Sequence, residues 1–198
     1  MEKLIITGGK KLGGEISVHG SKNAVLPIMA SALLIKGETV LHNVPNLSDV
    51  EASANILRRL GARVERKAST LIIDASSVTG NTIPEEMMRE MRSSIIFLGS
   101  LLSRCGEAWL CPPGGCDIGI RPIDLHISSL KKLGAQITEN GNCICCRALK
   151  LRGAKVFLSF PSVGATENII LAAVCANGKT TVINAAREPE ICDLAGFL

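Results

Sequence analysis

The residues best suited to chemistry lie in segment 111–126, which reads Cys-Pro-Pro-Gly-Gly-Cys-Asp-Ile-Gly-Ile-Arg-Pro-Ile-Asp-Leu-His. Glycines surround Cys116, which disfavours burial of this thiol in a regular element and predicts a reactive position on a loop. Arg121 follows, just ahead of an expected helix start at Pro122. A loop thiol next to an arginine and a helix start suits a reaction on an anionic substrate.

Three cations could hold the phosphate or carboxylate of such a substrate. Lys22, Arg92 and Arg121 each lie near the start of, or within, an expected helix, beside small polar residues or glycine. Backbone N–H groups at a helix start and a nearby cation can together bind an anion. The alternative is that all three are solvated basic side chains.

The elements that must position these residues follow a repeated plan. At an offset of 141 residues, Ser21, Ala24, Ala32, Gly37, Thr39 and Asn43 recur as Ser162, Ala165, Ala173, Gly178, Thr180 and Asn184. A middle unit at an offset of 69 residues carries Gly37 to Gly106, and the first two units both end in Leu-Gly-Ala. We expect units at about 21–89, 90–153 and 154–198, with the Cys116 loop inserted in the middle one. Insertions in repeats tend to lie on one working face.

Each complete unit is expected to run helix, strand, helix, strand, strand. The first unit is predicted to have a helix near 25–33, a strand at 39–41, a helix that Ser48 caps and that ends at Gly61, and strands at Val64 and 71–73. The middle unit is predicted to have a helix over 84–104, a strand at 108–111, a helix over 122–133, and strands at 136–138 and 143–146. The third is predicted to have a strand at 155–158, a helix over 162–176, a strand at 180–183 and a helix opening at 188–189. The predicted fold class is α/β (α+β).

The third unit is incomplete in this plan. In the register of the first unit Leu198 corresponds to Leu57, so the closing Leu-Gly-Ala and two strands have no counterpart. We expect a truncated chain or a fragment, whose last helix and sheet face lack partners. Such a chain exposes apolar surface or associates with itself through the open edge.

Composition excludes some functions. The 198 residues carry a net charge of +4 with 3% aromatic residues and no tyrosine, which disfavours nucleic-acid binding by stacking or by a broad basic face. No apolar run approaches the ~18 residues of a membrane span. The first residues lack the apolar core and small-residue cleavage site of a signal peptide, so a cytoplasmic location is expected.

Eight cysteines raise the question of disulfides or a metal site. A chain of this length can build a core without either. The cysteines in segment 143–146 alternate as in a strand, and no second pair at zinc spacing accompanies them, so no metal site is expected. Cys105, Cys175 and Cys192 fall on apolar helical positions and are predicted to be small core residues.

Five motifs in order resemble the enolpyruvyl transferases, and among them the UDP-N-acetylglucosamine 1-carboxyvinyltransferases that open bacterial peptidoglycan synthesis. The motifs are residues 20–24 (Gly-Ser-Lys-Asn-Ala), 91–92 (Met-Arg), 113–126, 162–166 (Ser-Val-Gly-Ala-Thr) and 184–190 (Asn-Ala-Ala-Arg-Glu-Pro-Glu). The resemblance spans essentially the whole chain. It implies an inside-out α/β barrel domain with three-fold pseudo-symmetry at 21–198, its third repeat incomplete, while residues 1–20 are strands of a second domain.

The resemblance also implies roles. Cys116 matches the cysteine that protonates the methylene carbon of phosphoenolpyruvate, can form a covalent adduct with it and is alkylated by fosfomycin-like epoxides. Lys22, Asn23 and Arg121 match residues that contact phosphoenolpyruvate. The expected contacts to UDP-N-acetylglucosamine are Arg92, Arg121, Pro122, Ile123, Asp124, Leu125, Ser162, Val163 and Gly164. No cofactor and no metal are implied.

Several residues remain open to more than one interpretation. His126 could shape the phosphate or thiol environment, although a histidine on a helix surface is more often simply hydrogen-bonded. Glu188 and Glu190 fit acids at a helix start better than catalytic carboxylates. Arg121 or Lys22 would lower the pKa of the Cys116 thiol and Asp117 would raise it. Phe160 stands where some relatives carry a lysine, so one basic contact to the nucleotide is absent.

Two alternatives to this function remain. One is the shikimate-pathway enolpyruvyl transferase, which needs no uridine pocket. The other is a non-catalytic binding or assembly module left by truncation. The resemblance further implies a second domain that supplies a catalytic aspartate and more arginines, so this chain by itself is expected to be inactive or to bind weakly.

Overall fold

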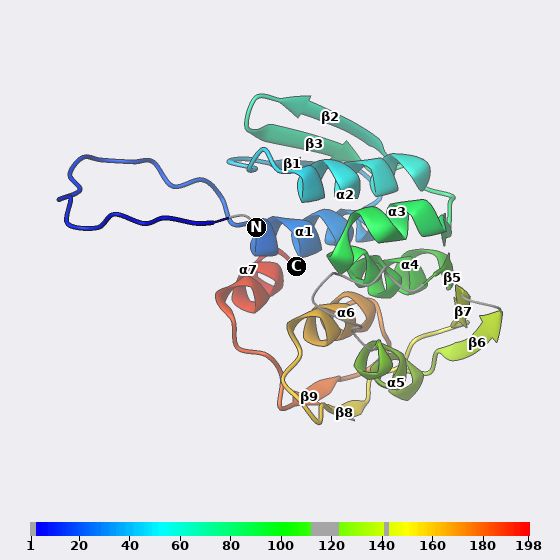
Figure 1. Cartoon of the computed structure of the whole chain (residues 1–198). Helices are drawn as coiled ribbons and strands as arrows, with labels where there is room; N and C mark the ends of the chain where they lie inside the picture. The colour runs from blue at the N-terminus through cyan, green and yellow to red at the C-terminus, as the bar shows by residue number, and fades with distance from the viewer. Residues whose placement is uncertain (1–2, 112–122, 141–142) are drawn as a thin grey trace.

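The structure is a computed structural model, and it describes residues 3–111, 123–140 and 143–198. Helices fill its centre and three small sheets lie around them (Figure 1). Residues 3–20 form no helix or strand and extend away from the body (Figure 1). Their apolar side chains, such as Leu4, Leu12 and Ile16, are almost fully exposed.

The first unit follows the predicted order of elements. It comprises α1 (Lys22–Ser31), the 3-10 turn η1 (Ala32–Leu34), β1 (Glu38–Leu41), α2 (Ser48–Arg59), β2 (Arg63–Lys67) and β3 (Thr70–Asp74). The strands form an antiparallel sheet in the order β1-β3-β2. The prediction that Ser48 caps α2 is wrong, because Ser48 is already helical and the preceding Leu47 holds the extended cap position without a side-chain bond.

The middle unit repeats this sheet but divides its first helix. It comprises β4 (Thr82–Ile83), α3 (Glu85–Glu90), η2 (Arg92–Ile96), α4 (Phe97–Cys105), β5 (Glu107–Leu110), α5 (Asp124–Lys132), β6 (Gln136–Asn140) and β7 (Cys143–Arg147). The predicted single helix over 84–104 is wrong. Met91 is extended (φ −134°, ψ 120°), and the Ser94 hydroxyl donates to the Met88 carbonyl at 3.1 Å, a local bond that competes with helical pairing.

The third unit contains β8 (Lys155–Phe157), α6 (Val163–Ala173), β9 (Thr181–Ile183) and α7 (Pro189–Phe197). Its two strands pair in parallel. The middle sheet has the order β4-β5-β7-β6, and its β4 also pairs with β5 in parallel. Among the described residues the three sheets stay separate and none closes on itself.

Packing of the central helices brings the units together. Helix α1 contacts α2, α4 and α7, and α6 contacts α4, α5 and α7. Helices α4 and α6 approach closely at Gly99 of α4, where an added Cβ would lie 2.5 Å from the Asn168 carbonyl oxygen of α6. Only glycine fits there, so this position fixes how α4 and α6 cross.

Local turns repeat between the units as the offsets predict. Asn43 and Asn184 both adopt left-handed backbone, with φ of 56° and 59°. Gly61 and Gly134, which end α2 and α5, have φ of 101° and 97°. In both Leu-Gly-Ala turns the alanine N–H donates to a leucine carbonyl five residues earlier, at 3.0 Å. The same residues therefore build the same helix ends in different units.

The cysteines differ from their prediction in two respects. Cys175 and Cys192 are exposed rather than buried. The helix predicted over 162–176 ends at Ala173, so Cys175 lies in the turn after α6, while Cys192 lies on α7, whose one buried residue is Leu194. Cys111 and Cys143 form a disulfide, with their Cα atoms 3.9 Å apart, which was not predicted. The register of β5 against β7 pairs Leu110 with Ile144 and so places these cysteines opposite each other.

Candidate functional site

The structure describes most, but not all, of the predicted site residues. Cys116, Arg121 and Pro122 lie outside the described residues. Arg92 begins η2, and its backbone alone is described. The remaining predicted residues lie at or beside the starts of three helices, α1, α5 and α6.

The start of α1 carries Lys22 and Asn23 in solvent. The Ser21 hydroxyl caps the helix by accepting the Ala24 N–H at 3.4 Å. Lys22 Nζ lies 2.9 Å from the carboxylate of Asp49 on α2, and both side chains are partly exposed. Asn23 Nδ2 donates to the carboxylate of Glu190 at 3.4 Å. Lys22 and Asn23, the two described candidates for contact with phosphoenolpyruvate, therefore each have an acidic partner that an arriving anion would displace.

The start of α7 supplies the acid that meets Asn23. Glu190 lies in the first turn of α7, as predicted for an acid favoured by the helix dipole. Glu188 holds the extended position before the helix, and its carboxylate accepts the Arg187 N–H at 2.8 Å instead of capping the helix.

A buried carboxyl group lies next to Glu190. Glu167 on α6 is 5% exposed. Burial, reinforced by the Glu190 carboxylate, raises the pKa of Glu167 to about 8. Sequence reasoning passed over Glu167, although the pair Glu167-Asn168 directly before the apolar run Ile-Ile-Leu was a signal that polar groups lie on a buried face. The buried side chain of Glu167 is therefore protonated at neutral pH.

The starts of α5 and α6 hold the described residues predicted to contact the nucleotide. Asp124 is exposed in the first turn of α5, and Ile123 and Leu125 are half-buried. The Ser162 hydroxyl caps α6 by accepting the Ala165 N–H at 3.3 Å, leaving the following residues Val163 and Gly164 in the first turn. Helix starts that present backbone N–H groups in this way can bind phosphate oxygens.

His126 of α5 is buried and contacts α6. It is 8% exposed, so the expectation of a surface histidine is wrong, although that of a hydrogen-bonded one is confirmed. Its Nδ1 lies 2.7 Å from Nδ2 of Asn168, which is fully buried on α6. A Cβ atom added at Gly164 would lie 3.2 Å from Cε1 of His126, so the ring packs closely on the α6 backbone. Burial lowers the pKa of His126 to about 4 and keeps the ring neutral.

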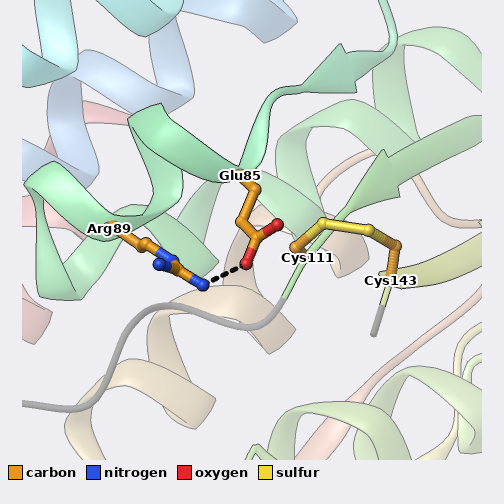
Figure 2. The surroundings of a disulfide bond; sticks show 4 residues. All are labelled: Glu85, Arg89, Cys111 and Cys143. Carbon is orange, nitrogen blue, oxygen red and sulfur yellow. Dashed lines mark hydrogen bonds and ion pairs between the residues drawn. A yellow bond between two sulfur atoms is a disulfide. The ribbon is translucent and has the colours of Figure 1, made fainter. Parts of the chain in front are cut away.

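The disulfide lies beside the segment that carries Cys116. Figure 2 shows Cys111 and Cys143 bonded at the ends of their strands, with the ion pair of Glu85 and Arg89 on α3 in their surroundings. In the chain, the segment that carries Cys116 therefore follows directly after a covalently held residue.

The described residues show neither a metal-binding cluster nor a membrane-spanning helix. They contain no group of three or more histidine, cysteine, aspartate or glutamate side chains placed to hold a metal ion. None of their helices combines the length and the hydropathy that crossing a membrane requires.

Comparison with known proteins places the chain in a family. A family profile described as EPSP synthase (3-phosphoshikimate 1-carboxyvinyltransferase) matches residues 6–198. The chain is 50% identical over 198 residues to UDP-N-acetylglucosamine 1-carboxyvinyltransferase 2 of Caldanaerobacter subterraneus subsp. tengcongensis, covering 100% of this chain and 48% of that protein. It is 49% identical over 203 residues to UDP-N-acetylglucosamine 1-carboxyvinyltransferase 1 of Symbiobacterium thermophilum, covering 100% and 46%. The chain thus spans about half the length of the curated relatives it matches.

Solved structures share the fold at lower identity. The enolpyruvyl transferase NikO from Streptomyces tendae superposes with a TM-score of 0.82 at 20% identity, covering 96% of this chain and 45% of that one. EPSP synthase from Acinetobacter baumannii superposes with a TM-score of 0.69 at 20% identity, covering 89% and 41%. The profile match, the two curated relatives and the shared α/β fold agree, and the chain belongs to the EPSP synthase family of enolpyruvyl (carboxyvinyl) transferases.

Proposed function

We propose that this chain is one half of an enzyme that transfers the enolpyruvyl group of phosphoenolpyruvate to the 3-hydroxyl of UDP-N-acetylglucosamine and releases phosphate. The observation that carries the proposal is about 50% identity, over the whole chain, to two relatives that are named for this activity. Such a transferase works in the cytoplasm at the first committed step of peptidoglycan synthesis. It needs no cofactor or metal.

The reaction assigns distinct tasks to the site residues. The sugar hydroxyl adds to C2 of phosphoenolpyruvate while C3 gains a proton, and the tetrahedral ketal then loses phosphate. Cys116 is the general acid at C3, a task that a thiol protonated at neutral pH can perform. Lys22 and Arg121 neutralise the phosphate and carboxylate. Asn23 orients a hydroxyl, and releasing it from Glu190 is part of substrate binding.

The nucleotide occupies the side of the site built by α5 and α6. Residues 121–125 and 162–164 surround the uridine diphosphate, and Arg92 meets its anionic groups. Phe160, which is 65% exposed, lies next to this stretch and offers an apolar face where some relatives have a lysine. We infer that the pyrophosphate is held by helix starts and arginines on this side.

We infer further that residues 21–198 form an inside-out barrel domain of three related units, the third incomplete, and that residues 1–20 pair with a second domain. Matched turns at Asn43 and Asn184, and at Gly61 and Gly134, support the repeats. The shared antiparallel orders β1-β3-β2 and β5-β7-β6 support them as well. The exposed apolar residues of segment 3–20 support a partner surface beyond this chain.

The proposal is tested by treating the 198-residue chain with a fosfomycin-like epoxide, with and without UDP-N-acetylglucosamine, and mapping the adduct by mass spectrometry. The exposed thiols Cys175 and Cys192 are internal controls, because they measure unspecific alkylation in the same tube. Labelling confined to Cys116 and enhanced by the nucleotide sugar supports the proposal. Scattered labelling that ignores the ligand supports a non-catalytic module instead.

A second measurement tests turnover and substrate identity. Mixing the chain with the remaining half of the Caldanaerobacter relative should restore phosphate release, whereas the chain alone should release little. A Cys116→Ala chain in the same mixture is the matched control. Activity with shikimate 3-phosphate but not with the UDP-sugar would instead assign the shikimate-type reaction.

A further inference from the structure

A hydrogen-bonded group at the centre of the protein connects the elements that line the expected nucleotide site. Asn168 of α6 is fully buried and contacts three other elements. Its Oδ1 accepts the N–H of Gly99 on α4 at 2.7 Å. Its Nδ2 donates to the carbonyl of Ile95 in η2 at 2.9 Å and lies 2.7 Å from Nδ1 of His126 on α5.

The chemistry of these partners fixes the orientation of every group. A backbone N–H can only donate, so the Gly99 N–H must meet the amide oxygen of Asn168. A backbone carbonyl can only accept, so the Ile95 carbonyl must meet the amide nitrogen. The second N–H of that nitrogen points at Nδ1 of His126, which must therefore accept. The imidazole is neutral and carries its proton on Nε2.

Each helix or turn held in this way also carries residues expected to bind the nucleotide. Ile95 lies three residues after Arg92 in η2, and His126 lies two residues after Asp124 in α5. Asn168 lies one helical turn after Gly164 in α6, and the His126 ring packs against Gly164 itself. A displacement of Asn168 or His126 would therefore move η2, α5 and α6, which carry the expected nucleotide contacts, relative to one another.

We propose that Asn168 and His126 are a positioning pair that sets the affinity of the UDP-sugar site by holding η2, α5 and α6 in register. The inference rests on the proposed function. The pair contacts no expected substrate atom and acts through the backbone of the residues that do. Because the pair is neutral and Asn168 uses both its amide oxygen and its amide nitrogen in hydrogen bonds, its geometry is independent of the charges that arrive with the substrates.

The wild-type chain offers the first test. Long-range proton–nitrogen spectra of the histidine rings distinguish the two neutral tautomers and the cation. We expect His126 as the Nε2–H tautomer at neutral pH. An Nδ1–H tautomer or a cation would overturn the proposal, since Nδ1 could then not accept from Asn168.

Matched variants separate positioning from simple packing. His126→Gln keeps an acceptor near Asn168, whereas His126→Leu fills the space without one. By calorimetry we expect the affinity for UDP-N-acetylglucosamine to fall about tenfold in His126→Leu and less than about threefold in His126→Gln. Affinity for phosphoenolpyruvate, which binds beside α1, should change less than about twofold in both.

Controls distinguish failure of this inference from failure of the proposed function. Ser100→Ala removes another buried hydroxyl of α4, one that has no partner within the described residues, and should leave both affinities unchanged. A wild-type protein, supplied with its second half, that fails to bind the UDP-sugar would overturn the proposed function and this inference with it. Normal wild-type binding with equal loss in the glutamine and leucine variants would overturn the positioning role alone. Asn168→Asp, which should move the ring proton to Nδ1, gives an independent spectroscopic check.

Discussion

Two regions of this protein hold candidate site residues by opposite means. Beside α1, the polar contacts join charged or exposed groups: Lys22 with Asp49, and Asn23 with Glu190. Between α5 and α6, the contacts join neutral groups that are almost fully buried, His126 and Asn168. The first region exchanges its partners easily with solvent or ligand, and the second does not.

The two regions show how one site can combine polar contacts that a ligand can replace with a buried network that keeps its shape. Exposed ion pairs contribute little to stability, so a substrate anion displaces them at small cost. A buried amide network contributes more, because each lost bond leaves an unsatisfied group. We therefore expect substitutions beside α1 to change ligand binding more than folding, and substitutions beneath α5 and α6 to change both.

The largest difference in unfolding free energy should come from replacing one asparagine in each region by alanine. Asn168→Ala leaves the buried Gly99 N–H and Ile95 carbonyl without partners and should cost about 3 kcal/mol of unfolding free energy. Asn23→Ala removes one exposed contact and should cost less than about 0.5 kcal/mol. Urea denaturation of both variants measures this. Similar losses would remove the distinction between the regions.

An effect of opposite sign is expected from Glu167, the buried acid on α6: its replacement should raise the folding stability. The pKa of Glu167 is about 8 in the folded chain against 4.5 for the ordinary side chain, so folding stability is lost as pH rises from 4.5 through 8. Glu167→Gln should therefore stabilise the chain clearly at pH 8 and leave its stability almost unchanged at pH 4. Melting curves at the two pH values test this. An equal shift at both would show that Glu167 is not protonated in the fold.

His126 should show the reverse dependence, with a somewhat smaller effect. Its pKa is about 4 when folded against 6.5 ordinarily, so its contribution is complete above pH 6.5 and is lost as pH falls through about 4. We expect a loss of stability between these pH values that His126→Gln abolishes. A glutamine variant with the same acid slope as wild type would attribute the loss to other groups.

The smallest effect should come from the ion pair at the start of α1. Asp49→Asn should change the unfolding free energy by less than about 0.5 kcal/mol, because both side chains are partly exposed. It should nevertheless strengthen phosphoenolpyruvate binding at low ionic strength, since Lys22 no longer has a competing carboxylate. Calorimetric titration at two salt concentrations measures it, and unchanged affinity would show that Lys22 does not meet the anion.

Local signals in the sequence predicted much of this fold. Leu-Gly-Ala at residues 60–62 and 133–135, and serine at 21 and 162, specify helix ends through backbone conformation and short-range bonds. These depend on a few neighbouring residues, so the sequence alone could predict these helix ends. The family motifs similarly predicted the candidate site, whose residue roles stay predictions.

Features that depend on contacts distant in the sequence could not be read in this way. The orientation of Glu167 and Asn168 follows from how α6 packs against α4, α5 and α7, which no local pattern specifies. Cys175 is exposed because α6 ends two residues before it, and Cys192 is exposed on α7, which buries Leu194 instead. The division of the 84–104 helix at extended Met91 is accompanied by a bond from the Ser94 hydroxyl to a carbonyl six residues earlier, a contact that apolar spacing does not indicate.

The bond between Cys111 and Cys143 changes the topology of the polypeptide. It converts the intervening stretch, including α5, into a covalent ring whose two ends meet at the middle sheet. A single proteolytic cut anywhere inside that ring opens it without dividing the molecule, so the nicked protein would migrate as one species until a reductant is added. An apparently intact band on a non-reducing gel can therefore conceal cleavage in the very segment that carries Cys116.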